Sequence, residues 1–322
     1  MQIIHKLKDI LFMARDFIKI MSGKSYFHQP DHLGKFFQDK RSYYIDFRGK
    51  VNWQGDFNEN VPVLYFPSID RTVFFPSTII QYGLGSIDKY FETNDTTYLI
   101  NVNSVYDWIK KNINQEFYLD NKLIELYESN IYYSNNSAMT QGTALSFLIR
   151  VLKFNLIVGD YNEVRMLIKN IYKNMLMPTN MNGTALYMHN DIYLCEYCRP
   201  DNYLVMNGSV FAIFGLYDYN FMFEEKESYL EKILNTFEKN APNYIMADNW
   251  SYYDNKMRLS SPIYQYTHIN LLEALYRLTH RETFNLMAIK LKAGYTLKNR
   301  VKYTIFKIID KLKDNLPYST VK

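Results

Sequence analysis

The residues best suited to chemistry lie in the stretch YLCEYCRPDNYLVMNG, residues 193–208. This stretch contains both cysteines of the chain, Cys195 and Cys198, on either side of Glu196 and Tyr197. Two thiolates at this spacing can bind a metal ion or form a redox pair, whereas a glutamate beside a tyrosine can transfer protons. The spacing alone therefore leaves thiol chemistry and acid–base chemistry as alternatives.

The cysteine pair lacks the partners that metal or redox chemistry needs. A structural zinc site takes four thiolate or imidazole ligands and a catalytic one usually three, yet His189 is the only histidine near the pair. A redox pair normally opens a helix after a strand, whereas RPDN, with Pro200, predicts a loop here. We therefore expect no metal site and no cofactor. Two cysteines also cannot form a disulfide framework, which fits a reducing compartment.

The composition favours a folded protein with an anionic partner other than nucleic acid. Of the 322 residues, 48% are hydrophobic, enough for a substantial core. The formal net charge is +4, but the chain lacks the dense basic runs of nucleic-acid binders and the glycine motifs of nucleotide sites. The 30 tyrosines could line a sugar cleft, because a ring stacks on a pyranose while its hydroxyl forms hydrogen bonds. An AT-rich coding sequence would explain the same number.

Residues 1–24 are predicted to form an N-terminal amphipathic helix. Apolar residues recur at helical spacing through MQIIHKLKDILFMARDFIKIM, with four basic residues among them. Charges interrupt the apolar run too often for a signal peptide or a transmembrane span, so we expect a cytoplasmic protein. Most such helices pack on their own domain. Contact of residues 3–21 with an anionic membrane surface is the alternative.

The rest of the chain predicts a strand-rich entry followed by helices. The entry region is predicted over residues 25–75, because from about residue 42 aromatic and polar residues alternate around Arg48-Gly49, as in a β-hairpin. Pro76 can open a helix, and helical periodicity dominates residues 76–322, the predicted catalytic domain. We therefore expect a mainly α fold with a small N-terminal β-hairpin region. Paired helices with short loops favour an α/α toroid, incomplete or (α/α)6-like, over an α-solenoid.

Four segments, in the same order, resemble motifs of the D-glucuronyl C5-epimerase family. CEYCRPDNYLVMNGSVFAIFGLYD is similar to a family stretch in which a Glu-Tyr pair precedes Leu-Asn-Gly and an apolar helix ending in Gly-Leu-Tyr-Asp. FFPSTIIQYGLGSIDKY resembles the family's Pro-x-x-x-x-Gln-Tyr-Gly-Leu helix, and SAMTQGTALSFLIR its Ser-Ala-Met-x-Gln-Gly helix. YQYTHINLLEAL resembles Tyr-His-x-x-His-Ile-Asn-x-Leu. The resemblance covers roughly residues 43–280.

The resemblance implies an isomerase that inverts carbon 5 of D-glucuronate to L-iduronate within a polysaccharide, as a heparosan-glucuronate 5-epimerase does. The carbon-5 proton is acidified only by the neighbouring carboxylate, so its removal builds an enolate-like dianion. Such a site needs proton-transfer groups on both faces of the ring and donors or cations around the carboxyl group. The implied partner is an anionic uronic-acid polysaccharide. A homodimer is left as an alternative to a monomer.

The resemblance also assigns roles to residues. It makes Glu196 and Tyr264 the proton-transfer pair on opposite faces of the sugar, with Tyr197 and Tyr253 binding the sugar or tuning that pair. The substrate-binding candidates are Asn207, His268, Asn270, Lys256, Arg258, Gln81, Tyr82, Gln141 and Arg199. Each tyrosine, taken alone, could equally be a packing residue, and His268 could be a structural histidine.

The sequence departs from the family pattern at the substrate carboxylate. The family arginine has no match in register, so Lys256 or Arg258 must replace it, and lysine offers a point charge where arginine offers a bidentate fork. Gln265 stands in place of the first histidine of Tyr-His-x-x-His, and Cys195 in place of an acid. A lyase or hydrolase on a similar toroid stays an alternative, because β-elimination removes the same proton. A non-catalytic glycan-binding module is the third interpretation.

Overall fold

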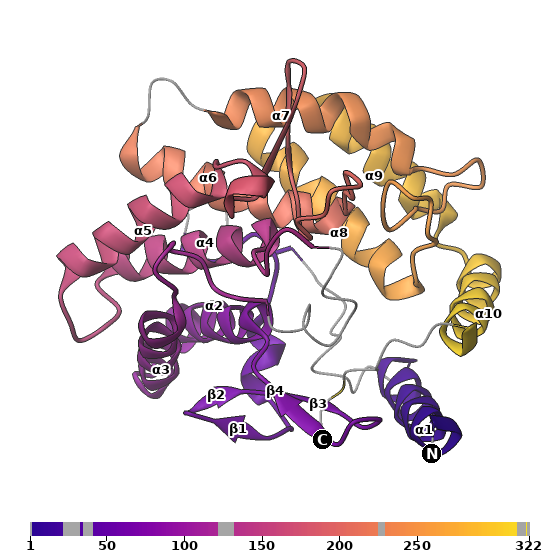
Figure 1. The fold of residues 1–322 in the computed structure, drawn as a ribbon, viewed down its shortest axis with the longest axis horizontal. Helices are drawn as coiled ribbons and strands as arrows, with labels where there is room; N and C mark the ends of the chain where they lie inside the picture. Colours follow the sequence, from indigo (N-terminus) through magenta and orange to yellow (C-terminus); the bar gives the residue numbers. More distant parts are fainter. Residues whose placement is uncertain are drawn as a thin grey trace.

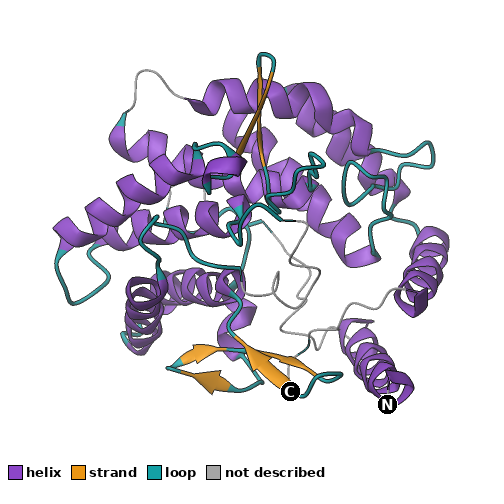
Figure 2. Ribbon diagram, viewed as in Figure 1, coloured by secondary structure: helices purple, strands orange, loops and turns teal. Residues whose placement is uncertain are grey.

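The computed structural model describes residues 2–21, 33–34, 41–121, 132–224, 229–313 and 320. This part of the chain is mainly helical with small antiparallel hairpins, as the sequence predicts (Figures 1 and 2). The α-helices are α1 (Gln2–Met21), α2 (Pro76–Thr93), α3 (Thr97–Asn112), α4 (Ala138–Phe154), α5 (Tyr161–Met175), α6 (Met206–Phe223), α7 (Tyr229–Asn240), α8 (Pro262–Thr279), α9 (Glu282–Gly294) and α10 (Leu297–Lys313).

Short 3-10 helices and hairpins connect these elements. The 3-10 helices are η2 (Arg48–Asn52), η5 (Thr179–Met181) and η6 (Ala241–Tyr244). The strands pair as β1 (Phe57–Asn58) with β2 (Val61–Pro62), β3 (Leu64–Phe66) with β4 (Arg71–Val73), and β5 (Ala185–Met188) with β6 (Asp191–Leu194). None of the described helices is long and apolar enough to cross a lipid bilayer.

The helix starts follow local sequence signals. Pro76 opens α2, where its missing N–H is not needed. Ser137 caps α4 and Ser261 caps α8, because each side chain accepts a hydrogen bond from a backbone N–H of the first turn. Asn94 and Asn155 end α2 and α4 in the left-handed conformation that asparagine tolerates.

Helices α2, α4, α6 and α8 form a row in which each contacts the next, and α3, α5, α7 and α9 each pack on the helix that precedes them in the chain. Neighbours in the row run parallel. Near the starts of α2 and α4, the hydroxyls of Ser77 and Thr140 lie 2.9 Å apart, and further along both helices Gly83 lies against the Phe147 ring. The N-terminal ends of the row therefore share one end of the molecule.

The contact between α4 and α6 depends on glycine. A β-carbon on Gly142 would lie 2.5 Å from the Ala212 Cα, and one on Gly215 would lie 2.5 Å from the Gly142 Cα. The two backbones therefore touch. Toward the C-terminal ends of the same helices, Arg150 Nη1 donates to Asp218 Oδ2 at 2.7 Å in a fully buried ion pair.

The prediction of β-hairpins within residues 25–75 is confirmed by β1–β2 and β3–β4, but their expected placement around Arg48-Gly49 is wrong. This position is the start of η2, and the hairpins lie after it. The physical reason is that consecutive aromatic residues before it enter the core: Tyr43 and Tyr44 are fully buried, and the Tyr44 hydroxyl donates to Asp218 Oδ1 at 2.5 Å. Residues 41–52 therefore pack near the C-terminal ends of α4 and α6. Residues 22–24 of the predicted N-terminal helix and residues 25–32 and 35–40 of the predicted entry region lie outside the described residues.

Candidate active site

Glu196 follows β6 in a loop whose backbone is fixed on both sides. Cys195 N donates to Thr184 O at 2.9 Å, and Cys195 O accepts from Ala138 N, at the start of α4, at 2.9 Å. On the other side, Cys198 O accepts from Tyr133 N at 2.7 Å. The loop therefore holds Glu196 at the N-terminal ends of α4 and α6.

The Glu196 carboxyl group is buried and has an unpaired oxygen. Burial raises its pKa to about 7, while a hydrogen bond with Tyr197 and the charge of Arg258 act in the opposite direction. Within the described part of the chain, its Oε2 atom has no hydrogen-bond partner. A carboxylate in this state is a stronger base than one in water, because its ionised form is poorly solvated.

Two tyrosines and a histidine form the part of the site next to Glu196. The Tyr253 and Tyr264 rings pack edge to face with centroids 4.8 Å apart, and the Tyr264 and His268 ring centroids are 6.5 Å apart. Burial raises the pKa of Tyr253 well above its usual value, and the charge of Glu196 adds to this shift. Tyr253 therefore interacts with Glu196 and touches Tyr264, which is 38% exposed to solvent.

His268 is a buried, neutral histidine. Burial lowers its pKa to about 3, and its Nδ1 atom lies 2.8 Å from the Ser251 hydroxyl. Gln265 fixes the same loop: its Oε1 accepts from Ser251 N at 2.8 Å, and its Nε2 donates to Leu291 O at 2.9 Å. Gln265, the departure from the family motif, thus has a positioning role in this structure.

Three predicted site residues carry buried polar atoms without a partner among the described residues. These atoms are Glu196 Oε2, Asn207 Oδ1 and His268 Nε2. Buried polar atoms are nearly always hydrogen-bonded, so a group of exceptions at one end of the helix row needs an explanation. A ligand that supplies the missing partners would provide one.

Arg258 is the cation that reaches this group. Its guanidinium group bonds the Asp254 carboxylate and the Tyr203 hydroxyl and lies 5.6 Å from the centre of the Tyr253 ring. Its charge also acts on Glu196. Sequence reasoning missed Tyr203 and Asp254, and no local signal marks the Asp254–Arg258 pair, because the i, i+4 rule applies to helices and these residues lie in a loop.

Lys256 and Arg199 form hydrogen bonds with a different residue, Asp201. Lys256 Nζ donates to Asp201 O at 2.8 Å, and Arg199 Nε donates to Asp201 Oδ1 at 2.9 Å. Arg199 also lies 4.7 Å from the centre of the Tyr203 ring. Lys256 and Arg199 therefore both bind Asp201, next to Arg258 and its partners Asp254 and Tyr203.

The other binding candidates belong to the framework. Gln141 is fully buried and exchanges two hydrogen bonds with the Leu119 backbone, at 3.2 and 3.3 Å, so its amide already has partners. Tyr82 packs edge-on to Phe57, and burial raises its pKa to about 12. Gln81 and Asn270 are also buried. Saccharide contacts by these four residues stay a prediction.

Both cysteines are buried thiols. Burial raises the pKa of Cys198 to about 12 and that of Cys195 well above its usual value. The Cys198 Sγ lies 3.4 Å from Asn136 O and 3.3 Å from Gly183 O. At neutral pH both groups are therefore protonated, whereas thiolates are the reactive form.

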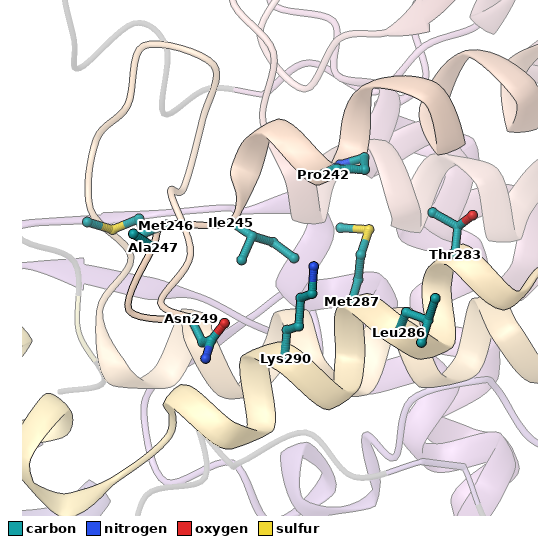
Figure 3. A pocket seen from close by; sticks show the side chains of 9 residues that line it. All are labelled: Pro242, Ile245, Met246, Ala247, Asn249, Thr283, Leu286, Met287 and Lys290. Atoms are coloured by element: carbon teal, nitrogen blue, oxygen red, sulfur yellow. The ribbon is translucent and has the colours of Figure 1, made fainter.

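A pocket of about 410 Å³ lies away from these residues. It is lined by Pro242, Ile245, Met246, Ala247, Asn249, Thr283, Leu286, Met287 and Lys290, between the η6 region and α9 (Figure 3). Its lining is mostly apolar and includes none of the predicted site residues. It therefore adds nothing to the acid–base group around Glu196.

The helical fold carries a group of residues around Glu196 in which burial shifts the pKa of a carboxyl group toward neutrality beside two tyrosines, a combination suited to general acid–base chemistry. Residues 112–293, more than half of the chain, match the family model described as D-glucuronyl C5-epimerase C-terminus. The chain belongs to the D-glucuronyl C5-epimerase family. No curated protein matches the chain. The matched range includes every predicted site residue except Gln81 and Tyr82.

Proposed function

We propose that this protein inverts carbon 5 of D-glucuronate residues within a polysaccharide to give L-iduronate residues. The observation that carries the proposal is the buried Glu196 carboxyl group, whose pKa is about 7 and whose Oε2 atom has no partner among the described residues. A base of this pKa is matched to neutral pH, where part of it is ionised and ready to accept a proton.

In the proposed reaction, Glu196 removes the carbon-5 proton. The electrons of the C–H bond move into the neighbouring carboxyl group and form an enolate-like dianion. Tyr264 then donates its hydroxyl proton to carbon 5 from the opposite face, and the electrons return to the new C–H bond. After the reaction Glu196 holds the carbon-5 proton and Tyr264 has lost its own, so Glu196 must release a proton and Tyr264 must regain one before the next turnover. Tyr264 is partly exposed, so it can take this proton from water. The reverse reaction exchanges the two roles.

The dianion needs positive potential, and three features can supply it. Arg258, whose charge acts on Glu196, has a planar fork that suits a carboxylate. The N-terminal ends of α4, α6 and α8 carry partial positive charge toward the same end of the molecule. If the Ser251 hydroxyl donates to His268 Nδ1, the neutral imidazole holds its proton on Nε2, the atom without a partner in the described chain, and can donate it to the substrate.

We further propose that the helices form an incomplete α/α toroid within residues 76–322. The row of parallel helices α2, α4, α6 and α8 corresponds to an inner ring, and α3, α5, α7 and α9 to an outer ring. In such an arrangement the loops at the N-terminal ends of the inner helices build the site. Glu196, Tyr253 and Tyr264 lie in or next to these loops.

The reaction is tested by incubating the protein with a glucuronate polymer such as heparosan in deuterated water. An epimerase introduces deuterium at carbon 5 and leaves the chains intact. New unsaturated ends that absorb in the ultraviolet would indicate a lyase, and new reducing ends without unsaturation a hydrolase. Binding without any of these products, across a set of uronans, would contradict the proposed activity and favour a glycan-binding module.

A further inference from the structure

Helix α1 is packed with its apolar face outward. Leu7, Leu11 and Ile18 are 52%, 65% and 66% exposed, and their spacing puts them on one side of the helix. Asp9 and Asp16, on the opposite side, are buried. This is the reverse of an amphipathic helix that covers a protein core.

The inward face of α1, which combines Asp9 and Asp16 with Phe12, attaches the helix to the protein. Asp9 Oδ1 accepts from Ser68 N at 3.1 Å, beside hairpin β3–β4. Asp16 bonds the Thr320 hydroxyl, and the Phe12 ring packs edge-on to that of Tyr65. The exposed leucines and isoleucine are therefore not needed to hold the helix in place.

Helix α10 also exposes an apolar face. Leu297, Val301 and Ile305 are between 51% and 65% exposed and follow each other at intervals of four residues along one face. The opposite face is anchored by Tyr303, which is 1% exposed. Its ring stacks on Trp250 at 4.4 Å, and its hydroxyl donates to Asp248 at 2.7 Å.

Basic residues accompany both apolar faces. The sequence of α10 contains Lys298, Arg300, Lys302, Lys307, Lys311 and Lys313 against the single acid Asp310. The sequence of α1 contains Lys6, Lys8, Arg15 and Lys19, while its two acids face the protein. In a symmetric dimer through these faces, the basic residues of one copy would meet those of the other. An anionic surface complements them.

We propose that α1 and α10 bind the surface of an anionic phospholipid membrane. The two helices lie along the same edge of the molecule in Figure 1. Neither can span a bilayer. A basic helix with one apolar face instead lies in the plane of the membrane, with its leucines and isoleucines among the acyl chains and its lysines at the headgroups. This surface is independent of the acid–base site, although α10 packs on Trp250, in the loop that carries Tyr253.

The proposal is tested by sedimenting the purified full-length protein with vesicles. Vesicles of phosphatidylglycerol and phosphatidylcholine in equal parts should pellet the protein, whereas pure phosphatidylcholine should not. Binding should weaken at high salt, because screening shortens the reach of surface charge to about 10 Å at 0.1 M and about 3 Å at 1 M. No sedimentation with the anionic vesicles at low salt would overturn the proposal.

Variants assign the binding to these faces. Val301→Ser with Ile305→Ser, combined with Leu11→Ser and Ile18→Ser, should weaken anionic-vesicle binding about tenfold or more, because apolar burial is lost. The control replaces Ile100, Val158 and Met166, exposed apolar residues on other elements (50% to 94% exposed), by serine and should bind as the wild type does.

Two further results would overturn the proposal. One is equal binding by the variant and the control. The other is a concentration-dependent dimer, measured by light scattering, that the four substitutions abolish without changing vesicle binding. That outcome would assign the faces to a second copy of the chain.

Discussion

The Glu196 side chain packs directly on the α-carbon of Gly208, in the first turn of α6. A β-carbon on Gly208 would lie 2.5 Å from the Glu196 Cβ and would overlap its Oε2 atom. Glycine at this position therefore makes room for the buried carboxyl group. Any larger residue must displace Glu196.

Gly208→Ala should lower kcat about 100-fold, because a catalytic group displaced by about 1 Å loses that much. Overpacking should also lower the free energy of unfolding by about 1 to 3 kcal/mol. The control is Gly85→Ala in α2, where a β-carbon would overlap Phe47 O, toward the other end of the helix row. This variant should lose stability but keep its activity per folded molecule. Wild-type turnover in Gly208→Ala would show that the position of Glu196 does not limit the reaction.

The pH dependence of kcat/KM should report the ionisation of Glu196. Its pKa is raised to about 7, and the ionised form is the base, so the rate should rise with pH up to about 7 and then level off. His268 should not contribute near neutrality, because its pKa is lowered to about 3. An acid limb at the ordinary glutamate pKa, about 4.3, would mean that Glu196 is solvated in the free enzyme.

The same shift predicts how Glu196 affects stability. Its pKa is higher in the folded protein than in the unfolded chain, so ionisation favours the unfolded chain and stability falls as the pH rises through the folded pKa. Relative to the wild type, Glu196→Gln should therefore gain about 3 kcal/mol of unfolding free energy between about pH 4 and about pH 8. Denaturant titrations at the two pH values measure the difference. If Glu196→Gln changed the unfolding free energy equally at both pH values, the pKa of Glu196 would not be raised in the folded protein.

Arg258 and Lys256 should differ in their effect on the reaction. Arg258→Gln should raise KM about tenfold or more by removing a charged hydrogen-bond donor to the substrate carboxylate. It should also move the acid limb of the pH profile upward, because the charge of Arg258 lowers the pKa of Glu196. Lys256→Gln should change both within about twofold, as for a surface substitution. If Lys256→Gln produced the larger effects, the assignment of the carboxylate partner would have to be reversed.

The helical part of the fold could be predicted from local signals. Pro76 marks the start of α2, and the apolar stretch before Gly215 becomes the buried helix α6. The motif residues Glu196, Tyr253 and Tyr264 come from separate segments, and periodicity alone does not bring them together. Their grouping was expected only through the family resemblance, and their catalytic roles stay predictions.

Features that depend on distant contacts could not be predicted. The consecutive aromatics Tyr43 and Tyr44 resemble a strand, but the Tyr44 hydroxyl reaches Asp218, 174 residues away. The apolar pattern of α1 indicates a helix but not which face it turns to the protein, because that depends on the polar groups that hairpin β3–β4 presents to it. Gln141 fits a family motif, yet its amide bonds the Leu119 backbone, a contact without a local signal.

The two-face mechanism is tested most directly by deuterium exchange at carbon 5 with Glu196→Gln and Tyr264→Phe. Each variant should lose inversion, because one face of the sugar has no proton-transfer group. Each should still exchange deuterium into only one of the two uronates, a different one in each variant, because the base on the other face remains. Full inversion by both variants would contradict the assignment of Glu196 and Tyr264 as the proton-transfer pair.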